Sequence, residues 1–268
     1  MFNIEKNKLF FIAGPCQIES LDHALMMASR LKDICEELGV PLIYKSSFDK
    51  ANRSSYRSTR GVGIEKGLEI LSHIKQRFQI PVLTDIHESY QAELAAHAGI
   101  DVLQIPAFLC RQTDLLIAAG ETGKWINVKK GQFLAPADMK NVADKISSTG
   151  NTNIMLCERG ATHGYNNLVV DMRSFPIMAS TGYTVVYDAT HSVQQPGSMG
   201  TSSGGDRSMV PSLARSAVAS GYVNGVFIEC HQDPDNAPSD GPNMININNM
   251  LGLIHQLTSI HQCSTLFV

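Results

Sequence analysis

The sequence has no long hydrophobic run and no excess of charge of either sign. Its apolar stretches fall well short of the roughly 18 residues that a membrane-spanning helix needs. The formal net charge of −3 provides no basic field that would attract nucleic acid or a membrane surface. These absences argue against a membrane protein, and against a nucleic acid or a membrane as the partner.

Paired cysteines are also missing. No CxxC motif occurs, and such scattered cysteines are typical of reduced cytosolic thiols and not of a disulfide framework. The first residues, MFNIEKNKLFFIAG, lack the basic-then-apolar order and the small-residue cleavage site of a secretory signal. We therefore expect a cytoplasmic protein. The six cysteines are Cys16, Cys35, Cys110, Cys157, Cys230 and Cys263.

Nucleotide-binding signatures and linkers are absent as well. There is no GxxxxGK[ST] loop, and Gly61 and Gly63 are followed by Gly67 without the dinucleotide-binding spacing. We therefore expect no nucleotide cofactor. Because α/β barrels reach this length as one unit and no low-complexity linker interrupts the chain, we expect a single domain over residues 1–268.

The sequence does contain eight short apolar runs of strand length, separated by stretches of helical character such as 21–38 and 67–78. Strands that alternate with helices predict a parallel sheet. Eight such units fit a closed (β/α)8 barrel, also called a TIM barrel, and a short hairpin is expected before it at 3–8. The eight runs are 9–13, 41–44, 81–83, 102–105, 125–128, 153–156, 184–187 and 225–228.

Residues with chemically active side chains follow nearly every run. In such barrels the active site forms at the carboxyl ends of the strands, so we expect these side chains to meet at one mouth. Two polar, glycine-rich segments at 194–207 and 232–243 would lie on the same face. They are long enough to act as lids, although plain surface loops would have the same composition. The active residues are Cys16, Lys45, Asp85, His87, Gln104, Lys129, Arg159, His191 and Glu229.

Positive charge recurs at the ends of several runs. The segment YKSSFDKANRSS (44–55) carries Lys45, Lys50 and Arg53 among serines and an asparagine, and Lys129 and Arg159 follow the fifth and sixth runs. A phosphate group needs positive charge and short hydrogen-bond donors, and arginine can grip two of its oxygens. A lone lysine is ordinarily a solvated surface residue. Several cations at one barrel mouth, however, predict a ligand with several negative charges.

Four potential metal ligands follow the first, seventh and eighth runs: Cys16, His191, Glu229 and Asp240. These strands are neighbours in a closed barrel, so the four side chains can meet. A thiolate, an imidazole and two carboxylates suit a divalent transition metal (Zn, Fe, Mn or Co) with a position left for water. No short ligand motif is present, and a buried cysteine is often only a small hydrophobic residue. Spacing alone leaves both interpretations open.

Taken together, these motifs resemble the 3-deoxy-D-manno-octulosonate 8-phosphate synthase family nearly end to end, and KSSFDKANRSS (45–55) is the most specific of them. The resemblance implies a (β/α)8 barrel, usually a homotetramer. It implies condensation of phosphoenolpyruvate with D-arabinose 5-phosphate, with release of phosphate, for the lipopolysaccharide inner core. The segments are IAGPCQIES (12–20), 44–68, TDIHE (84–88), LQIPAFLCRQTDL (103–115), INVKKGQFLAP (126–136), CERG (157–160), DATHSVQQPG (188–197) and SDGPN (239–243).

The resemblance also implies roles for individual residues. Phe108 and Arg111 would help to close the site near a subunit interface, so that loops are shared in the tetramer. The catalytic candidates would be His191, Asp240 and Lys50, the first two as proton carriers. The phosphoenolpyruvate site would comprise Lys45, Ser47, Lys50, Gln104, Ala107, Lys129 and Arg159. The sugar-phosphate site would comprise Asn52, Arg53, Ser54, Asp85 and His87, with Arg53 reaching the arabinose phosphate.

The family has two branches, and Cys16 implies the one that binds a divalent metal through Cys, His, Glu and Asp. The other branch has Asn at that position and works without metal. Two rival functions stay open. One is the related 3-deoxy-D-arabino-heptulosonate 7-phosphate synthase, which uses erythrose 4-phosphate and would carry a KPRT-type loop in place of ANRSS. The other is a non-catalytic barrel that binds an anionic sugar phosphate.

Overall fold

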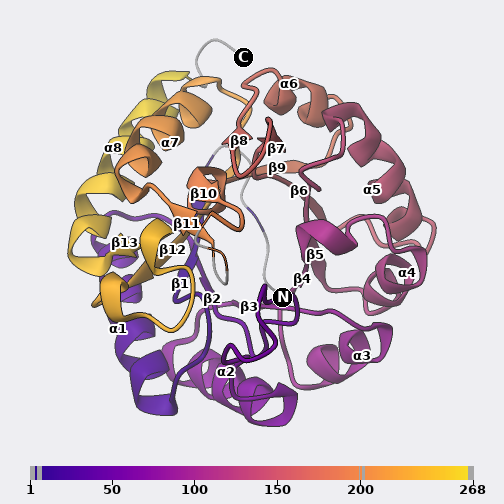
Figure 1. The fold of residues 1–268 in the computed structure, drawn as a ribbon. Helices are drawn as coiled ribbons and strands as arrows, with labels where there is room; N and C mark the ends of the chain where they lie inside the picture. The colour runs from indigo at the N-terminus through magenta and orange to yellow at the C-terminus, as the bar shows by residue number, and fades with distance from the viewer. Residues whose placement is uncertain (1–3, 5–7, 199, 201–202, 265–268) are drawn as a thin grey trace.

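Eight parallel strands close into a barrel at the centre of the molecule, and helices form a ring around it (Figure 1). The computed structural model describes residues 4, 8–198, 200 and 203–264. Strand β12 pairs with both β9 and β1, which closes the barrel and confirms the (β/α)8 fold. The barrel strands are β1 (Phe10–Gly14), β2 (Leu42–Lys45), β3 (Val82–Asp85), β4 (Val102–Ile105), β5 (Trp125–Lys129), β6 (Ile154–Glu158), β9 (Thr184–Asp188) and β12 (Gly225–His231).

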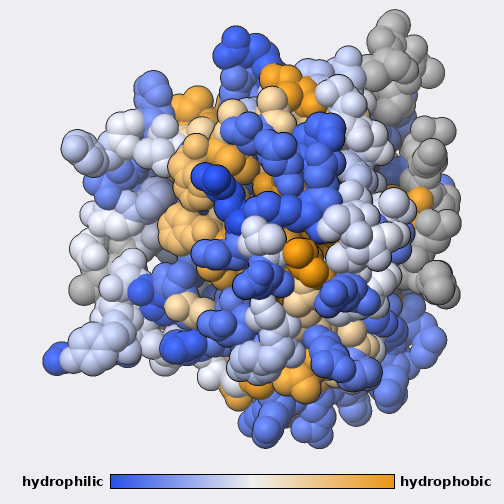
Figure 2. Space-filling view, turned by 90° about the vertical axis from the view of Figure 1, so that its right-hand side faces the viewer, coloured by the Kyte–Doolittle hydropathy of each residue, from blue (hydrophilic) through white to orange (hydrophobic). Residues whose placement is uncertain are grey.

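The helices are amphipathic and bury one face against the strands. In α1 the Ser20 side chain caps the first turn by accepting the His23 N–H at 3.1 Å. Ala24, Met27 and Leu31 of that helix are buried, as a period of 3.6 residues predicts. On the side of the molecule in Figure 2, hydrophilic residues predominate and hydrophobic ones form small groups. The helices are α1 (Leu21–Glu37), α2 (Ile64–Phe78), α3 (Ser89–His97), α4 (Thr113–Glu121), α5 (Met139–Ser147), α6 (Ser174–Ala179), α7 (Val210–Ala219) and α8 (Met250–Ser264).

The loops at the carboxyl ends of the strands hold short extra strands. β7 (Ala161–Thr162) pairs with β8 (Leu168–Val169), and β10 (Gln194–Gln195) pairs with β11 (Gly204–Gly205). β13 (Ile245–Asn246) extends the sheet beside the end of β12. The glycine-rich segment 194–207 thus contains β10 and β11, and the segment 232–243 contains two short 3-10 turns, at Pro234–Asn236 and Gly241–Asn243. Both segments are partly structured in the part of the chain that the structure describes.

All eight predicted strands exist, and each begins within one residue of its apolar run. Most strands end later than predicted, because their last residues are polar yet buried; β12, for example, runs to His231 and not to 228. Helix α2 begins at Ile64, three residues before the expected start. Most of the hairpin expected at 3–8 lies outside the described residues. The single-domain organisation over 1–268 stays a prediction.

The inside of the barrel is apolar at one end and polar at the other. Phe10, Ile12 and Phe227 belong to the inner apolar cluster, whereas buried Asn127 and Glu229 lie farther along the strands. Backbones approach closely where the polar layer begins: a Cβ on Gly14 would lie 1.9 Å from the carbonyl oxygen of Lys45. Glycine is therefore required at the end of β1. Among the described residues, no helix is long and apolar enough to cross a membrane.

Candidate active site

A pocket of about 470 Å³ opens at the carboxyl ends of the strands, where the barrel fold places its functional groups. The structure brings most of the predicted site residues to its wall. Those that line the pocket are Lys45, Lys50, Asn52, Arg53, Ser54, Asp85, His87, Gln104, Ala107, Phe108, Lys129, Arg159, His191, Glu229 and Asp240.

Three predicted residues do not line this pocket. Ser47 lies behind it, where it donates to Asp85 and accepts from Lys50 Nζ at 3.1 Å. Cys16 lines a small separate cavity and donates to Asp240 Oδ2 at 3.0 Å. Arg111 is exposed and is not brought to the pocket; its carbonyl accepts from Lys145. The role predicted for Arg111 therefore depends on a second subunit and stays a prediction.

The four potential metal ligands meet because β1 and β12 are adjacent in the barrel. Gly14 is paired with Glu229, so the loop that carries Cys16 begins beside that carboxylate. Ligand atoms of Cys16, Glu229 and Asp240 all lie within 4.8 Å of one another. His191 Nε2 lies 3.5 Å from Glu229 Oε2 and 4.0 Å from Asp240 Oδ2. The sequence prediction that these side chains lie close together is confirmed.

The chemistry of this cluster fits a divalent cation. Oε2 of Glu229 is buried and has no hydrogen-bond partner in the described chain, although burying an unpaired carboxylate oxygen is costly. Burial, together with the charges of Asp240 and Glu229, raises the pKa of the Cys16 thiol. The thiol keeps its proton and donates a hydrogen bond to Asp240. A bound metal would replace that proton and take the thiolate, imidazole and carboxylates as mixed ligands suited to a transition metal. These residues could therefore hold a metal ion.

Asp188 is a functional residue that the sequence reasoning missed. It ends β9, is fully buried, and its Oδ2 lies 2.9 Å from His191 Nδ1 while it also pairs with Lys129. Its Oδ1 accepts the His191 backbone N–H at 2.9 Å. Burial would raise the pKa of Asp188, but His191 and Lys129 outweigh burial and lower it. A carboxylate that holds Nδ1 fixes the imidazole so that Nε2 faces the other ligands.

A buried arginine offers an anion site on the pocket wall. Arg159 donates through Nη2 to Gln194 Oε1 at 2.9 Å, while its Nη1 has no hydrogen-bond partner among the described residues. Burial lowers the pKa of this guanidinium, and Asp188 opposes that effect. Lys129 Nζ lies 3.5 Å from the centre of the Phe227 ring. An anionic ligand would supply the partner that Arg159 lacks.

On the opposite wall, Asp85 organises the polar groups by accepting from Ser47 and Gln104. Burial would raise its pKa, yet the charges of Lys45 and Lys50 lower it, so the carboxylate is ionised. The pKa of His87 is lowered by burial, which favours a neutral ring. This wall presents a carboxylate and a neutral imidazole, groups that suit sugar hydroxyls.

At the rim of the pocket, Arg53 connects its own loop to the loop that carries Gln17 and to the loop that carries Ser239. It donates to Gln17 Oε1 at 2.8 Å and to Ser239 Oγ at 2.7 Å. Ser239 in turn donates to Asp240 Oδ2 at 3.2 Å. The segment that carries Arg53 is thus connected to a metal-ligand candidate through one serine.

A comparison with protein families places this site in a known context. Residues 3–263 match the model of the DAHP synthetase I family. The chain belongs to this family. DAHP is the heptulosonate product of the rival enzyme considered above, so the family description alone does not separate the two activities. The comparison with individual proteins does separate them.

Similar members of the DAHP synthetase I family carry the other name. The chain is 65% identical over 246 residues to the 2-dehydro-3-deoxyphosphooctonate aldolase of Granulibacter bethesdensis, covering 92% of this chain and 86% of that protein. The protein of the same name from Rhizobium meliloti is 59% identical, covering 94% of this chain and 90% of that protein. The one from Agrobacterium fabrum is 61% identical, covering 92% of this chain and 86% of that protein. That name denotes the same enzyme as 3-deoxy-8-phosphooctulonate synthase. The resemblance predicted from the motifs is confirmed.

We expect Asp188→Asn to lower the free energy of unfolding by about 3 kcal/mol, because Lys129 would lose its buried counter-charge. Urea denaturation followed by circular dichroism measures this. The matched control is Asp171→Asn, which breaks an exposed pair with Arg173 and should change stability little. Equal losses in the two variants would contradict the role given to the buried pair.

Proposed function

We propose that this chain condenses phosphoenolpyruvate with D-arabinose 5-phosphate and water to give 3-deoxy-D-manno-octulosonate 8-phosphate and inorganic phosphate. The observation that carries the proposal is the ring of cations in the pocket, with Lys45, Lys129 and Arg159 at the ends of three different strands. The ANRSS segment, which differs from the loop expected of the heptulosonate enzyme, lies at the rim. Relatives 59–65% identical carry the octulosonate name.

For phosphoenolpyruvate, the buried end of the pocket supplies the charge. We assign Lys129 and Arg159 to its phosphate and carboxylate, and the unpartnered Nη1 of Arg159 supports this. Lys50 is held near by Ser47, and its pKa is raised because Cys16 and Glu229 outweigh the effect of burial. The remaining assigned residues are Lys45, Ser47, Gln104 and Ala107.

For arabinose 5-phosphate, the rim and the Asp85 wall supply donors and acceptors. Arg53 would grip the sugar phosphate after exchanging its bonds to Gln17 and Ser239. Asp85 and His87 would bind hydroxyl groups. Asn52 and Ser54 complete this assignment, and Phe108, 58% exposed at the pocket edge, would cover the sugar together with a neighbouring subunit.

The reaction joins C3 of phosphoenolpyruvate to the aldehyde carbon while water adds at C2. The resulting hemiketal phosphate loses phosphate by cleavage of its C–O bond, which leaves the 2-keto product. Holding the weak enol nucleophile against the aldehyde supplies much of the rate, and cations stabilise the developing charge. His191, Asp240 and Lys50 are the assigned catalytic residues, the first two as proton carriers, and all three line the pocket.

We further propose a divalent transition metal, Zn, Fe, Mn or Co, held by Cys16, His191, Glu229 and Asp240. The unpaired Oε2 of Glu229 and the mixed donor set support it. When bound, such an ion polarises a hydroxyl group or water. We also propose a homotetramer with shared active-site loops, and a cytoplasmic location, which the six free cysteines favour.

The substrate assignment is tested by measuring phosphate release from phosphoenolpyruvate with each aldehyde. With added divalent metal, we expect release with arabinose 5-phosphate and little with erythrose 4-phosphate, because the ANRSS segment replaces the loop of the heptulosonate enzyme. Release only with erythrose 4-phosphate would make the substrate assignment wrong. Binding of both substrates without any release would indicate the non-catalytic barrel.

The two groups of cations should have separable roles. Lys129→Ala and Arg159→Ala should impair use of phosphoenolpyruvate, whereas Arg53→Ala should mainly raise the KM for arabinose 5-phosphate. Each lost charge-assisted contact should cost roughly 1.5–3 kcal/mol, or about one to two decades in kcat/KM. Steady-state kinetics with each substrate varied in turn measures this. Arg77→Ala, at an exposed position in α2, is the control, and wild-type KM values for both substrates in the Arg53 variant would refute the assignment.

The metal should be required for turnover. Exhaustive chelation should abolish activity, and Mn, Co, Zn or Fe should restore it to different degrees. Cys16→Ala should lose metal and activity together, because it removes the softest ligand. Cys16→Asn should retain some activity that resists chelation, as the metal-free branch implies.

The control for these variants is Cys263→Ser, at an exposed cysteine. Elemental analysis and phosphate release are measured on the same samples. Full activity of the unmodified protein after chelation, with no metal found, would overturn the metal proposal and leave the substrate assignment intact.

A further inference from the structure

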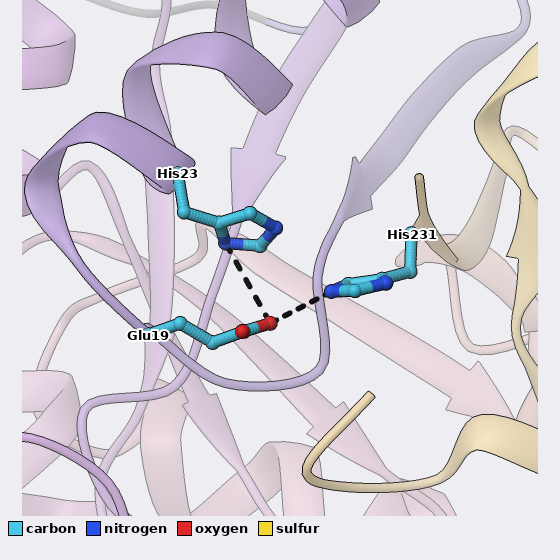
Figure 3. Close-up of side chains that lie close together, drawn as sticks. All are labelled: Glu19, His23 and His231. Carbon is cyan, nitrogen blue, oxygen red and sulfur yellow. Dashed lines mark hydrogen bonds and ion pairs between the residues drawn. The ribbon is translucent and has the colours of Figure 1, made fainter. Parts of the chain in front are cut away.

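A second group of titratable side chains lies beside the metal ligands. Ligand atoms of Glu19, His23 and His231 are within 4.8 Å of one another, and Figure 3 shows both rings near the Glu19 carboxylate. Glu19 follows Cys16 by three residues, and His231 ends β12 two residues after Glu229. Cys16, Glu19 and His231 line one small cavity. This second group therefore touches the same two segments that carry the metal ligands.

The directions of the hydrogen bonds show that His231 is not itself poised to bind a metal. The backbone N–H of Asp233 donates to His231 Nδ1 at 3.0 Å, so this nitrogen carries the lone pair. In a neutral ring the proton is then on Nε2, which donates to Glu19 Oε1 at 2.7 Å. A metal ligand would need the opposite tautomer, with its second nitrogen donating to an acceptor. The Glu19–His231 contact is accordingly a hydrogen bond between two segments.

The loop that carries Cys16 is held at its start by Lys45, which donates to the Cys16 carbonyl at 3.0 Å, and by the bridge between Gln17 and Ser47. The last residue of β1 that is paired with β12 is Gly14, so Cys16 lies beyond the sheet, in the loop that leads to α1. His231 is 3% exposed, and its place at the end of β12 is held by pairing with Asn246 of β13. Its hydrogen bond to Glu19 ties the far end of the Cys16 loop to the strand that carries Glu229.

His23 has a different position in the group. Its Nε2 lies 2.8 Å from Gln232 Oε1, and its Nδ1 is 3.7 Å from Glu19 Oε1, beyond hydrogen-bond distance. The His23 ring also lies against the His231 ring, with centroids 4.9 Å apart, but it donates neither nitrogen to the Glu19–His231 hydrogen bond. This difference makes His23 a matched control for the other two residues.

We propose that Glu19 and His231 are positioning residues that set the distance between Cys16 and the carboxylate ligands, and so tune metal affinity. The inference rests on the proposed metal site. It adds to that site two residues that do not touch the ion. Loss of the contact should weaken metal binding by about tenfold, the lower end of what outer residues contribute at metal centres.

The test is the affinity of the full-length protein for Co²⁺, measured by competition with a chelator, together with the thiolate-to-cobalt absorption band. His231→Asn keeps an acceptor near the Asp233 amide but has no donor that reaches Glu19, so it should bind about tenfold more weakly and alter the band. His231→Gln places an amide nitrogen near the Nε2 position and should restore most of the affinity. Glu19→Ala should behave like His231→Asn, and Glu19→Gln like His231→Gln.

Three further measurements separate positioning from a merely structural role. The KM for phosphoenolpyruvate at saturating metal should stay within about twofold of wild type in all variants, because Lys129 ends β5 and Arg159 follows β6, away from β1 and β12. His23→Gln should keep wild-type affinity and one cobalt per chain. The melting temperature of the metal-free protein reports any general loss of stability.

Three other outcomes would overturn the proposal, and each can be told from the others by the cobalt measurements. Wild-type affinity and spectrum in both His231→Asn and Glu19→Ala would refute the positioning role. Two cobalt ions per wild-type chain, one of them lost in His23→Gln, would make the group a metal site instead. A wild-type chain that binds no cobalt would refute the metal proposal itself, and this inference with it.

Discussion

The barrel mouth holds charged groups that water would otherwise solvate, and it does so by pairing them across strands. Lys45 pairs with Glu229, and Lys129 pairs with Asp188, all four being almost fully buried. Each lysine is on a different strand from its carboxylate: Lys129 and Asp188 flank β6, and Lys45 and Glu229 flank β1. Because an unpaired buried charge is expensive, the Lys45–Glu229 pair favours the closure of β1 against β12 that brings the two together. The two lysines are thereby fixed in place, whereas Nη1 of Arg159 has no hydrogen-bond partner among the described residues.

The sequence predicted the architecture well because apolar runs and strand ends coincide. It also predicted most of the pocket wall, since barrel topology places every strand end at one mouth. The strand ends themselves were predicted too short, because a rule based on apolar runs stops at residues such as Asp85 and Glu158, which are polar and yet buried. Burial of a charge depends on its partner across the barrel, which spacing along the chain does not reveal.

Asp188 and His231 were missed for the same reason. Each is the last residue of a strand, but its role depends on contacts with residues of other segments: Asp188 contacts His191 and Lys129, and His231 donates to Glu19. Arg111 shows the opposite case, since a motif suggested a role that the folded chain alone does not give it. Residues that touch a ligand can be predicted from motif chemistry, whereas residues that orient others need coordinates.

The close approach of Gly14 to the carbonyl of Lys45 limits how this site can change. Backbone atoms are in contact there, so the loop with Cys16 and the loop with Lys50 cannot move apart or slide without unpairing β1 from β2. Asn52, Arg53 and Ser54 lie beyond this contact and line the pocket. Under the proposed function, a change of aldehyde would therefore be accommodated by reshaping the rim and not by resizing the barrel.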